Sequence, residues 1–588
     1  MWDRSRVVEA QQVLAAAGGV TVLIHDQGCA AELRRARKRG LAPPPTHRVL
    51  VNERVCEGCG DCGAKSACLS VQAVATEFGP KVRIHQDSCN FDYSCADGDC
   101  PSFTLVERAG GQQKPAPAPE TEEPIRPALD DEFVIRLPGV GGTGVVTLAH
   151  IIARAAALDG YEVRGLDQTG MSQKAGPVVS DLRIMTAGGQ RPARGSAGGV
   201  DLYLALDPVV GLAPEYAAGL SRSTAVVGSS TWTPPGTFIG RPYESVAESD
   251  TLRQSISAVD TAAWIDAEGL AVALTGRASG ANVLLLGYAY QRGLLPLAGT
   301  SIEQAIERNG VAVDANLAAF RWGRAVAADP DRQSDGESDG SVALPPRLRD
   351  RVAALDVDED IRAMVRRRVA DLVGYQDERY AGRYLTTVER VAGTGAAELV
   401  RTVAEYLHKL MAYKDEYEVA RLHLAPEARV RAAEIGGPGA RVTILLHPPL
   451  LRALGLKHKL RFGPRTRPVL RLLAQGRRIR GGPLDVFGMT RVRRTERRLI
   501  TEYEALVAGL VDRLGAVGFE PAVEMARLPD MIRGYEDIKL DNVRRYDAAL
   551  ADMKAANGFG RPGQSIGTPR RERRTPVGGT PTSLNGKS

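Results

Sequence analysis

The sequence lacks any long hydrophobic run and any strong excess of one charge, and both absences narrow its possible functions. The longest apolar stretch, near Ala281 to Tyr290, is far shorter than the roughly 20 residues of a membrane-spanning helix, so we expect no membrane segment. The chain carries 76 lysines and arginines against 70 aspartates and glutamates, a net charge of +6 over 588 residues. This small excess gives no reason to expect nucleic acid as a partner.

Aromatic residues are also scarce, at 5% of the chain, and none interrupts the short basic runs. Basic runs of this kind are more often solvated faces than nucleic-acid sites. We interpret them as solvated surface, with docking of an acidic partner such as a ferredoxin as the alternative. The runs are Arg34 to Arg39, Arg477 to Arg480, Arg491 to Arg498 and Arg570 to Arg574.

The first ten residues, Met1 to Ala10, are charged and lack the apolar core of a signal peptide. Seven of the eight cysteines nevertheless lie close together, between Cys56 and Cys100. Disulfide frameworks are typical of short secreted chains, whereas crowded thiols without a secretion signal indicate a reducing compartment. We therefore expect a cytoplasmic protein whose cysteines bind metal.

Three cysteines follow C-x2-C-x2-C spacing, at Cys56, Cys59 and Cys62, and Cys100 is followed by Pro101. Three thiolates on one tight loop wrap one face of an iron-sulfur cube, and Cys-Pro commonly closes such a run. Zinc is the alternative, but structural zinc usually takes its ligands as two separated pairs. The pattern predicts one or two 4Fe-4S clusters and a role in electron transfer.

The seven clustered cysteines divide into two sets by analogy with two-cluster ferredoxins, in which the distal cysteine of a run ligates the other cube. The first cysteine set comprises Cys56, Cys59, Cys62 and Cys100. The second cysteine set comprises Cys68, Cys89 and Cys95, which is one ligand short of a cluster. Cys29 is the remaining cysteine. It either completes the second set or is a small structural thiol beside an incomplete site.

Two stretches of linker composition divide the chain. The segment 109–131 is rich in Pro, Ala and Glu, and 328–346 is acidic and rich in Ser and Gly. We predict multidomain α/β architecture, with a small iron-sulfur domain over 46–108, a doubly wound Rossmann-like domain over 132–327 and a mainly α-helical domain over 347–555. A tail over 556–588 has too few large apolar residues to fold.

The first block opens with a predicted helix over 5–17 and a strand over Val20 to His25. A lone strand must join a sheet, so we expect its neighbours to lie on another polypeptide. Between the two cysteine runs, the alternating segment Lys81 to His85 predicts a strand.

The middle block alternates strand and helix. Phe133 to Leu137, Val145 to Leu158 and Tyr161 to Leu166 predict a βαβ unit. Further strands are expected at Val178 to Ile184, Asp201 to Leu206, Thr224 to Gly228 and Ser255 to Val259. The third block shows apolar residues at helical spacing, which predict amphipathic helices that pack on a shared core. These residues are Leu399, Val403, Tyr406 and Leu410, then Leu499, Tyr503, Leu506 and Leu510.

A glycine turn follows the first strand of the middle block. Its G-x-G-x-x-G pattern and the acid Asp167, about 20 residues beyond, fit a dinucleotide site, in which the helix N-terminus attracts phosphate. A plain strand-to-helix turn is the alternative. A second polar loop, 169–177, is expected at the same sheet edge and favours an anion or a partner's cofactor. The candidate cofactor-binding residues are Gly139, Gly141, Gly142, Thr143, Gly144, Thr169 and Gly170.

Specific motifs resemble those of a known family. The two glycine-loop segments closely resemble the gamma domain of 2-oxoacid:ferredoxin oxidoreductases. The cysteine block resembles the fused bacterial indolepyruvate ferredoxin oxidoreductase, and the last block is similar to the uncharacterised C-terminal domain of that fusion. The segments that carry the resemblance are 137–147, 166–184, 22–40, 55–71, 88–103, 409–422, 460–464 and 528–535.

The resemblance implies oxidative decarboxylation of a 2-oxoacid, such as an aryl pyruvate, with CoA taking the acyl group and ferredoxin taking the electrons. The family's GDG segment with a downstream Asn, which binds thiamine diphosphate, does not occur here. Residues 1 to about 45 therefore resemble the end of that domain, and thiamine diphosphate and Mg²⁺ would come from another portion or subunit of an oligomer. No residue stands out as a catalytic acid, base or nucleophile, and His25 and His85 are interpreted as structural.

Two other functions are compatible with the same residues. One is a nonenzymatic iron-sulfur subunit that carries electrons or serves assembly, with a gamma-like domain that has lost its ligand. The other is a Rossmann oxidoreductase that reduces NAD(P) from the clusters. Reduction of ferredoxin by 2-oxoacid and CoA, with and without thiamine diphosphate, distinguishes the first from the enzyme, and nicotinamide binding reveals the second.

Overall fold

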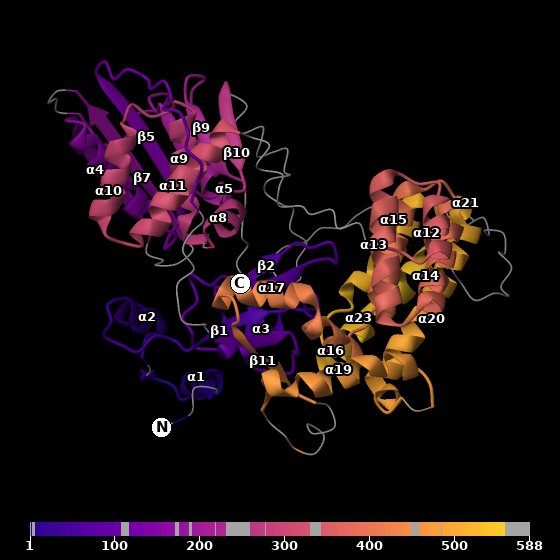
Figure 1. Cartoon of the computed structure of the whole chain (residues 1–588). Helices are drawn as coiled ribbons and strands as arrows, with labels where there is room; N and C mark the ends of the chain where they lie inside the picture. Colours follow the sequence, from indigo (N-terminus) through magenta and orange to yellow (C-terminus); the bar gives the residue numbers. More distant parts are fainter. Residues whose placement is uncertain are drawn as a thin grey trace, which may run out of the picture.

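The computed structural model consists of three units, shown in Figure 1: an α/β domain, a cysteine-containing unit below it and a helical bundle beside both. The predicted strand Ser255 to Val259 and the predicted tail lie almost entirely outside the described residues. The structure describes residues 2, 6–26, 28–107, 117–170, 176–186, 191–217, 219–230, 259–276, 278–329, 343–448, 455, 458–483 and 485–558.

The middle domain is built on a six-stranded sheet with the order β10-β9-β8-β5-β7-β6. Strands β8, β9 and β10 follow β5 in parallel, whereas β7 pairs antiparallel with both β5 and β6. The sheet is therefore mixed, and β7 separates the two strands of the predicted βαβ unit. The strands are β5 (Glu132–Val140), β6 (Glu162–Thr169), β7 (Pro177–Met185), β8 (Leu202–Ala205), β9 (Ala225–Ser229) and β10 (Thr261–Ile265).

Helices cover this sheet and bury its apolar residues. The predicted helix over Val145 to Leu158 is confirmed as α4 (Val145–Leu158), whose buried side chains join those of β5 in one core. Short α5 (Pro208–Gly211) and α6 (Pro214–Ala217) follow β8. The other helices are α8 (Ala267–Thr275), α9 (Ala281–Gln291), α10 (Gly299–Asn309) and α11 (Val313–Ala328).

No single helix among the described residues is long and apolar enough to cross a membrane. One bent pair, Ala267–Thr275 with Ala278–Gln291, meets the length and composition criteria together. In the structure, α9 lies within the core of the middle domain.

The second half of the predicted linker 109–131 lies against the middle domain. Arg324 of α11 binds the carbonyls of Thr121 and Glu122 and pairs with the Glu123 carboxylate at 2.8 Å. This part of the segment therefore packs along α9 and α11.

The cysteine unit, residues 47–107, holds β1 (His47–Val51) and β4 (Phe103–Glu107) as an antiparallel pair and β2 (Val71–Val74) with β3 (Lys81–Ile84) as a hairpin. The predicted strand at Lys81 is thus confirmed. The short helices α3 (Asp61–Ser66) and η2 (Ser94–Ala96) carry cysteines between the strands.

The sheet of the cysteine unit is completed by the C-terminal part of the chain. Strand β11 (Arg441–Leu446) pairs antiparallel with β4, and β12 (Leu460–Phe462) pairs with β11. The sequence analysis placed both strands in a separate, mainly helical block, because a short apolar run does not reveal a partner far away in the chain. The two parts therefore share one sheet.

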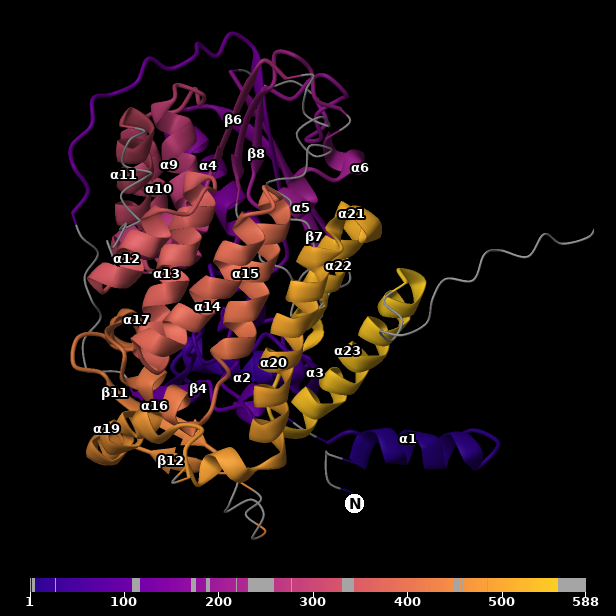
Figure 2. The ribbon, with the colours of Figure 1, turned by 90° about the vertical axis from the view of Figure 1, so that its right-hand side faces the viewer.

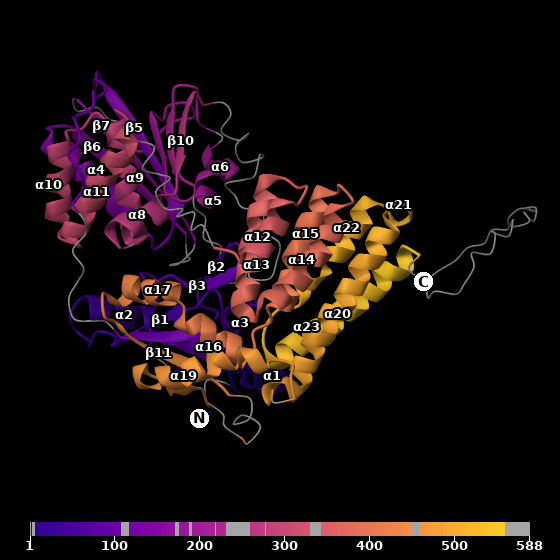
Figure 3. The ribbon, with the colours of Figure 1, turned by 45° about the vertical axis from the view of Figure 1, so that its right-hand side comes forward.

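The helical bundle has a continuous apolar core, and the two predicted amphipathic stripes lie in it on α15 and α20. Figure 2 shows the long helices side by side, and Figure 3 shows α16, α17 and α19 around the cysteine unit. The helices are α12 (Pro346–Ala353), α13 (Glu359–Tyr375), α14 (Glu378–Ala392), α15 (Ala397–Met411), α16 (Glu416–Leu424), α17 (Pro426–Gly436), α19 (Arg467–Gln475), α20 (Arg491–Asp512), α21 (Leu514–Val517), α22 (Phe519–Arg527) and α23 (Glu536–Ala556). Short 3-10 turns η6 (Pro464–Thr466), η7 (Gly476–Ile479), η8 (Phe487–Met489) and η9 (Leu528–Met531) connect them.

The N-terminal prediction is half right. The first helix forms as α1 (Val7–Ala16), but Val20 to His25 forms no strand. Val20, Val22 and Ile24 are 98%, 73% and 84% exposed. A strand needs a neighbour to bond its backbone, and none of the described strands lies beside this segment.

Candidate metal centre and glycine turns

The first cysteine set is assembled by the antiparallel pairing of β1 with β4. Val51 pairs with Phe103, and the backbone N–H of Asn52 donates to Ser102 O at 2.8 Å. The loop after β1 therefore lies beside the residues before β4. Cys56 is on that loop and Cys100 precedes β4. Cys59 and Cys100 also line one small pocket. The structure therefore brings the distal cysteine to the C-x2-C-x2-C loop.

Cys56 is buried, Cys59, Cys62 and Cys100 are partly buried, and the four thiols are electrostatically coupled. Burial, followed by the charge of Cys100, raises the pKa of Cys56 to about 12. Burial raises the pKa of Cys59 to about 11, with Cys100 adding to the rise. The Gly58 amide donates to Cys56 Sγ at 3.4 Å, as backbone amides do at iron-sulfur sites. A bound metal reverses this tendency to remain protonated, because coordination deprotonates a thiol.

The second cysteine set surrounds the β2–β3 hairpin. Cys68 precedes β2, Cys89 follows β3, and Cys95 lies in η2. Burial raises the pKa of Cys95 to about 12, with further contributions from Cys89 and Cys68. The Phe91 amide donates to Cys89 Sγ at 3.4 Å. These three thiols thus lie near one another, while their division into sets and their ligation stay predictions.

Burial raises the pKa of Cys62, and the thiols of Cys56, Cys100 and Cys59, together with Cys95 of the second set, raise it further. Among the described residues, no three His, Cys, Asp or Glu side chains converge on one metal ion. A single ion needs its ligands to converge on one point, whereas four cysteines hold a cube of several irons at separate corners. The buried thiols, their amide donors and the short loops fit such a cluster.

Cys29 precedes α2 (Ala30–Lys38) and is exposed. Arg34 and Arg37 of this helix donate to the carbonyls of Asp87 and Asn90, the latter at 3.2 Å. The helix therefore lies against the loop that carries Cys89, although ligation by Cys29 stays a prediction. These two arginines bind backbone rather than facing solvent, which corrects the interpretation of the first basic run.

The two histidines interpreted as structural lie in different settings. His85 contacts Ser88 Oγ at 2.8 Å, which fits a structural role, and His25 lies in the irregular N-terminal segment.

A buried carboxylate that the sequence analysis overlooked is Glu57, next to Cys56. Burial alone would raise its pKa, but the charges of Lys539, Lys81, Lys414 and Lys409 hold the pKa below its ordinary value.

The glycine turn after β5 requires glycine at two positions. Gly142 and Gly144 have φ of +88° and +107°, where a Cβ is unfavourable. The Gly141 amide donates to Gly176 O at 2.7 Å, so the turn and the loop after β6 lie at one sheet edge. Thr169 ends β6 there and Gly170 follows it, while 171–175 lie outside the described residues. The neighbouring positions of the two loops agree with the prediction.

Asp167 does not take the position of a ribose-binding acid. Antiparallel β7 lies between β5 and β6, so the acid is separated from the glycine turn by two strand spacings, about 10 Å. Its Oδ1 accepts a hydrogen bond from Ser180 Oγ at 2.5 Å, and His150 Nε2 lies 3.7 Å from Oδ2. This arrangement disfavours the dinucleotide interpretation.

Residues missed by the sequence analysis connect the glycine turn to the cysteine unit. Asn282 Nδ2 donates to Thr143 O at 3.2 Å, and the Ser279 amide donates to Asp87 Oδ2 at 2.8 Å. Asp87 lies two residues before Cys89. The segment 279–282 therefore contacts both candidate sites, and no sequence motif marks it.

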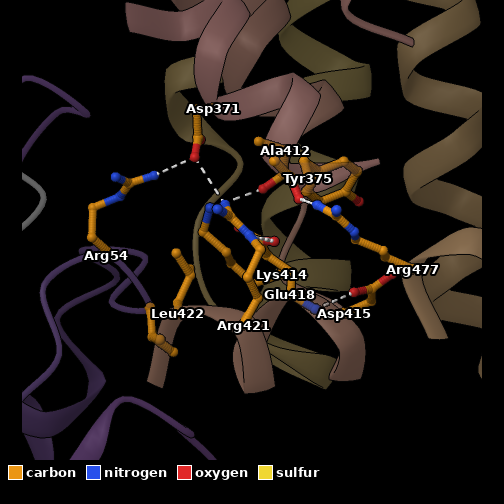
Figure 4. Close-up of polar contacts among 12 residues, drawn as sticks. Arg54, Asp371, Tyr375, Ala412, Lys414, Asp415, Glu418, Arg421, Leu422 and Arg477 are labelled. Atoms are coloured by element: carbon orange, nitrogen blue, oxygen red, sulfur yellow. Dashed lines mark hydrogen bonds and ion pairs between the residues drawn. The ribbon is translucent and has the colours of Figure 1, made fainter. Parts of the chain in front are cut away.

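The C-terminal domain contacts the cysteine unit through a buried charge network, shown in Figure 4. Arg54, two residues before Cys56, binds Asp371 Oδ1 at 2.7 Å, and Arg421 binds the same oxygen at 2.8 Å. His408 Nε2 lies 3.2 Å from Asp371 Oδ2. Arg480, from a run interpreted as solvated, is buried and binds both oxygens of Asp415.

A further contact predicts how stability depends on pH. His423 Nε2 donates to Pro101 O at 2.8 Å, and Asn52 Nδ2 donates to His423 Nδ1 at 3.4 Å, which defines a neutral ring. Burial lowers the pKa of His423 to about 4. In the unfolded chain the same side chain titrates near 6.5, so the unfolded state binds the proton first as the pH falls. The contribution of His423 to the free energy of unfolding is therefore complete above pH 6.5, and roughly 3 kcal/mol of it is lost as the pH falls toward 4.

His423→Gln keeps a donor for Pro101 O but removes the titrating group. We expect its unfolding midpoint, measured in denaturant at pH 7 and pH 4.5, to fall less between the two values than that of the unaltered chain. An equal fall in both proteins would contradict the assignment.

Comparisons with known proteins divide the chain in the same way as its fold. Residues 134–326 match the family "Pyruvate ferredoxin/flavodoxin oxidoreductase", and residues 361–552 match a family of unknown function, DUF6537. Indolepyruvate oxidoreductase subunit IorB of Archaeoglobus fulgidus is 29% identical over 193 residues, which are 32% of this chain and 90% of the relative. The Pyrococcus horikoshii subunit of that name is 28% identical, over 33% of this chain and 94% of the relative.

Among solved structures, pyruvate oxidoreductase subunit PORC of Thermotoga maritima covers 33% of this chain and 96% of its own, with 22% identity and a TM-score of 0.25. The homology of the middle domain follows from the sequence matches and not from this structural similarity. The middle domain is a gamma-like domain homologous to IorB, and it is joined to a domain of unknown function.

Proposed function

We propose that the chain is the iron-sulfur and gamma-domain part of a 2-oxoacid:ferredoxin oxidoreductase that acts on an aryl pyruvate such as indolepyruvate. The observation that carries the proposal is the hydrogen bond that joins an IorB-like domain to a unit with two groups of buried or partly buried thiols. In the proposed reaction the 2-oxoacid loses CO2, CoA takes the acyl group, and two electrons leave one at a time for ferredoxin.

The residues of this chain have distinct roles in that reaction. The first cysteine set would hold one 4Fe-4S cluster, and the second set with Cys29 would hold another. Such clusters accept and donate single electrons. Asp87 and Ser279 hold the second set against the gamma-like domain, because their bond of 2.8 Å joins the two units. Gly142 and Gly144 let the backbone at the sheet edge approach an anionic ligand or a partner's loop.

The thiamine diphosphate and Mg²⁺ of the proposed reaction belong to another portion or subunit. Support comes from the exposed residues Val20, Val22 and Ile24, whose apolar side chains would be covered if the segment joined a partner's sheet. An oligomer in the cytoplasm follows from the same proposal. NAD(P) chemistry is less well supported, because β7 displaces Asp167 from the glycine turn.

Iron content tests the proposal directly. Chain purified without oxygen is expected to contain about four to eight irons with matching acid-labile sulfide, as one or two cubes require. Stoichiometric zinc without sulfide would reject the iron-sulfur assignment. Reduction of ferredoxin by indolepyruvate and CoA, assayed with a thiamine-binding partner present and absent, then separates the enzyme from a nonenzymatic electron carrier.

A further inference from the structure

The domain of unknown function lies directly on the first cysteine set. Gly534, with φ of +96°, precedes α23, and a Cβ there would lie 3.3 Å from the Cβ of Cys59. The next residue, Tyr535, donates to Val55 O at 2.5 Å. Arg533 Nη1 donates to Glu57 O at 3.4 Å. The segment 533–535 therefore covers the loop that carries Cys56 and Cys59.

The covering segment brings positive charge to this loop. The Arg533 side chain is 11% exposed, and Lys539 Nζ lies 3.9 Å from Glu57 Oε2. Lys409 Nζ donates to the carbonyl of Asp530, next to this segment, at 2.9 Å. Lys414 and Lys81 are also buried, each 8% exposed. Four of these five cations come from the C-terminal domain, and Lys81 comes from β3.

Two of these cations have no close ion-pair partner in the described part of the chain, although the Glu57 carboxylate acts on both from a greater distance. Lys81 Nζ donates to Cys56 O at 2.8 Å, and Lys414 Nζ donates to Ala412 O at 2.9 Å, but neither forms an ion pair there. Figure 4 shows Lys414 and its bond to Ala412. A buried ammonium group without a close counter-charge is costly, and the one carboxylate of Glu57 is shared among four lysines. A cluster held by four thiolates carries net negative charge, which would compensate these lysines.

The second cysteine set has a different electrostatic environment. After burial and an amide hydrogen bond, the charges that act on Cys89 are those of Cys68, Arg48 and Asp92, and none belongs to the C-terminal domain. Asp92 acts on Cys95 as well. Arg533, Lys539, Lys409 and Lys414 are therefore absent from the charges that act on Cys89. Of the C-terminal cations, Lys459 lies beside the second set, where it donates to Ala96 O at 2.6 Å.

We propose that the domain of unknown function is an electrostatic cover that raises the reduction potential of the first cluster above that of the second. Positive charge near a cluster favours its reduced form, which carries one more negative charge, and exclusion of solvent strengthens the effect. Electrons that reach the cysteine unit then collect at the first set. This inference rests on the proposed iron-sulfur function.

Arg533 offers the sharpest test, because its partner Asp530 is 46% exposed and tolerates the loss of an ion pair. We expect Arg533→Met to lower the ratio of reduced to oxidised first cluster about tenfold at a fixed ambient potential, or about 59 mV for a one-electron couple. Arg533→Lys, which keeps the charge, should leave the ratio unchanged. Paramagnetic resonance during redox titration of the full-length chain reports each cluster separately.

The control is Arg390→Gln, which removes an exposed arginine paired with Asp512 at the opposite end of the bundle and should shift neither cluster. Lys409→Met provides a second charge-removing variant and should shift the first cluster in the same direction. An unchanged potential in both charge-removing variants, or equal shifts of both clusters, would overturn the inference. Absence of iron from the unaltered chain would instead reject the proposed function.

Discussion

Replacing Cys100 with alanine is expected to remove one cluster and leave the other, so iron should fall from about eight to about four per chain. The physical reason is the pairing of β1 with β4, which brings Cys100 to the loop of Cys56 and Cys59. Iron and sulfide analysis of anaerobically purified protein, with paramagnetic resonance, measures the loss. The resonance that disappears identifies the first set.

Cys95→Ala is the matched control, because it should remove the other resonance and leave that of the first set. Cys29→Ser extends the experiment to the proposed eighth ligand. Lower iron or an altered second resonance would make Cys29 a ligand, whereas an unchanged spectrum would leave it as a structural thiol. Loss of both resonances in Cys100→Ala and in Cys95→Ala alike would contradict two separate sites.

The proximity of Cys100 to the loop of Cys56 and Cys59 was predictable because it depends on local spacing, whereas the division of the thiols between two clusters stays a prediction. C-x2-C-x2-C fixes three cysteines on one loop, and a short antiparallel sheet is enough to return Cys100 to them. The strands and helices of the middle domain were predictable for the same reason, since periodicity over α4 and β5 is a local property. The strand order of its sheet was not predictable, because no feature of the β7 sequence indicates that this strand lies between β5 and β6.

The covering of the first cysteine set could not be read from the sequence. β11 reads as a short apolar run within a helical block, and its partner β4 is more than 300 residues away in the chain. No sequence feature marked Arg533 or Lys414, because a sequence gives no measure of their burial near Glu57. Arg480 was misread for the same reason, since its partner Asp415 lies on another element.

The sequence of the glycine turn predicted its backbone conformation but not the position of the acid that was expected to accompany it. Gly142 and Gly144 were expected to permit unusual backbone angles, and both have positive φ. The acid that completes a dinucleotide site was expected at Asp167, but the hydroxyl of Ser180 binds it. Contact with an anion or a partner at the edge shared with the loop after β6 therefore stays the prediction for this turn.

Substitution of Gly142 by valine is expected to lower turnover of the complete enzyme, with its thiamine-binding partner present, by about 100-fold or more. A Cβ obstructs the approach of a ligand or partner loop, and valine at φ of +88° displaces the turn, where a shift of about 1 Å is enough for such a loss. Iron content should not change, because the thiols lie in a different unit. Turnover is measured as ferredoxin reduction by indolepyruvate and CoA.

Gly160→Val separates a lost contact from simple backbone strain. Gly160 has φ of +86°, almost equal to that of Gly142, but it follows the C-terminal end of α4, and a Cβ there meets nothing within 4 Å. The two variants should therefore lose similar stability, while only Gly142→Val loses turnover. If both variants keep full activity, the turn is only a connection between strand and helix. If both lose activity equally, strain in the domain rather than contact at the sheet edge explains the effect.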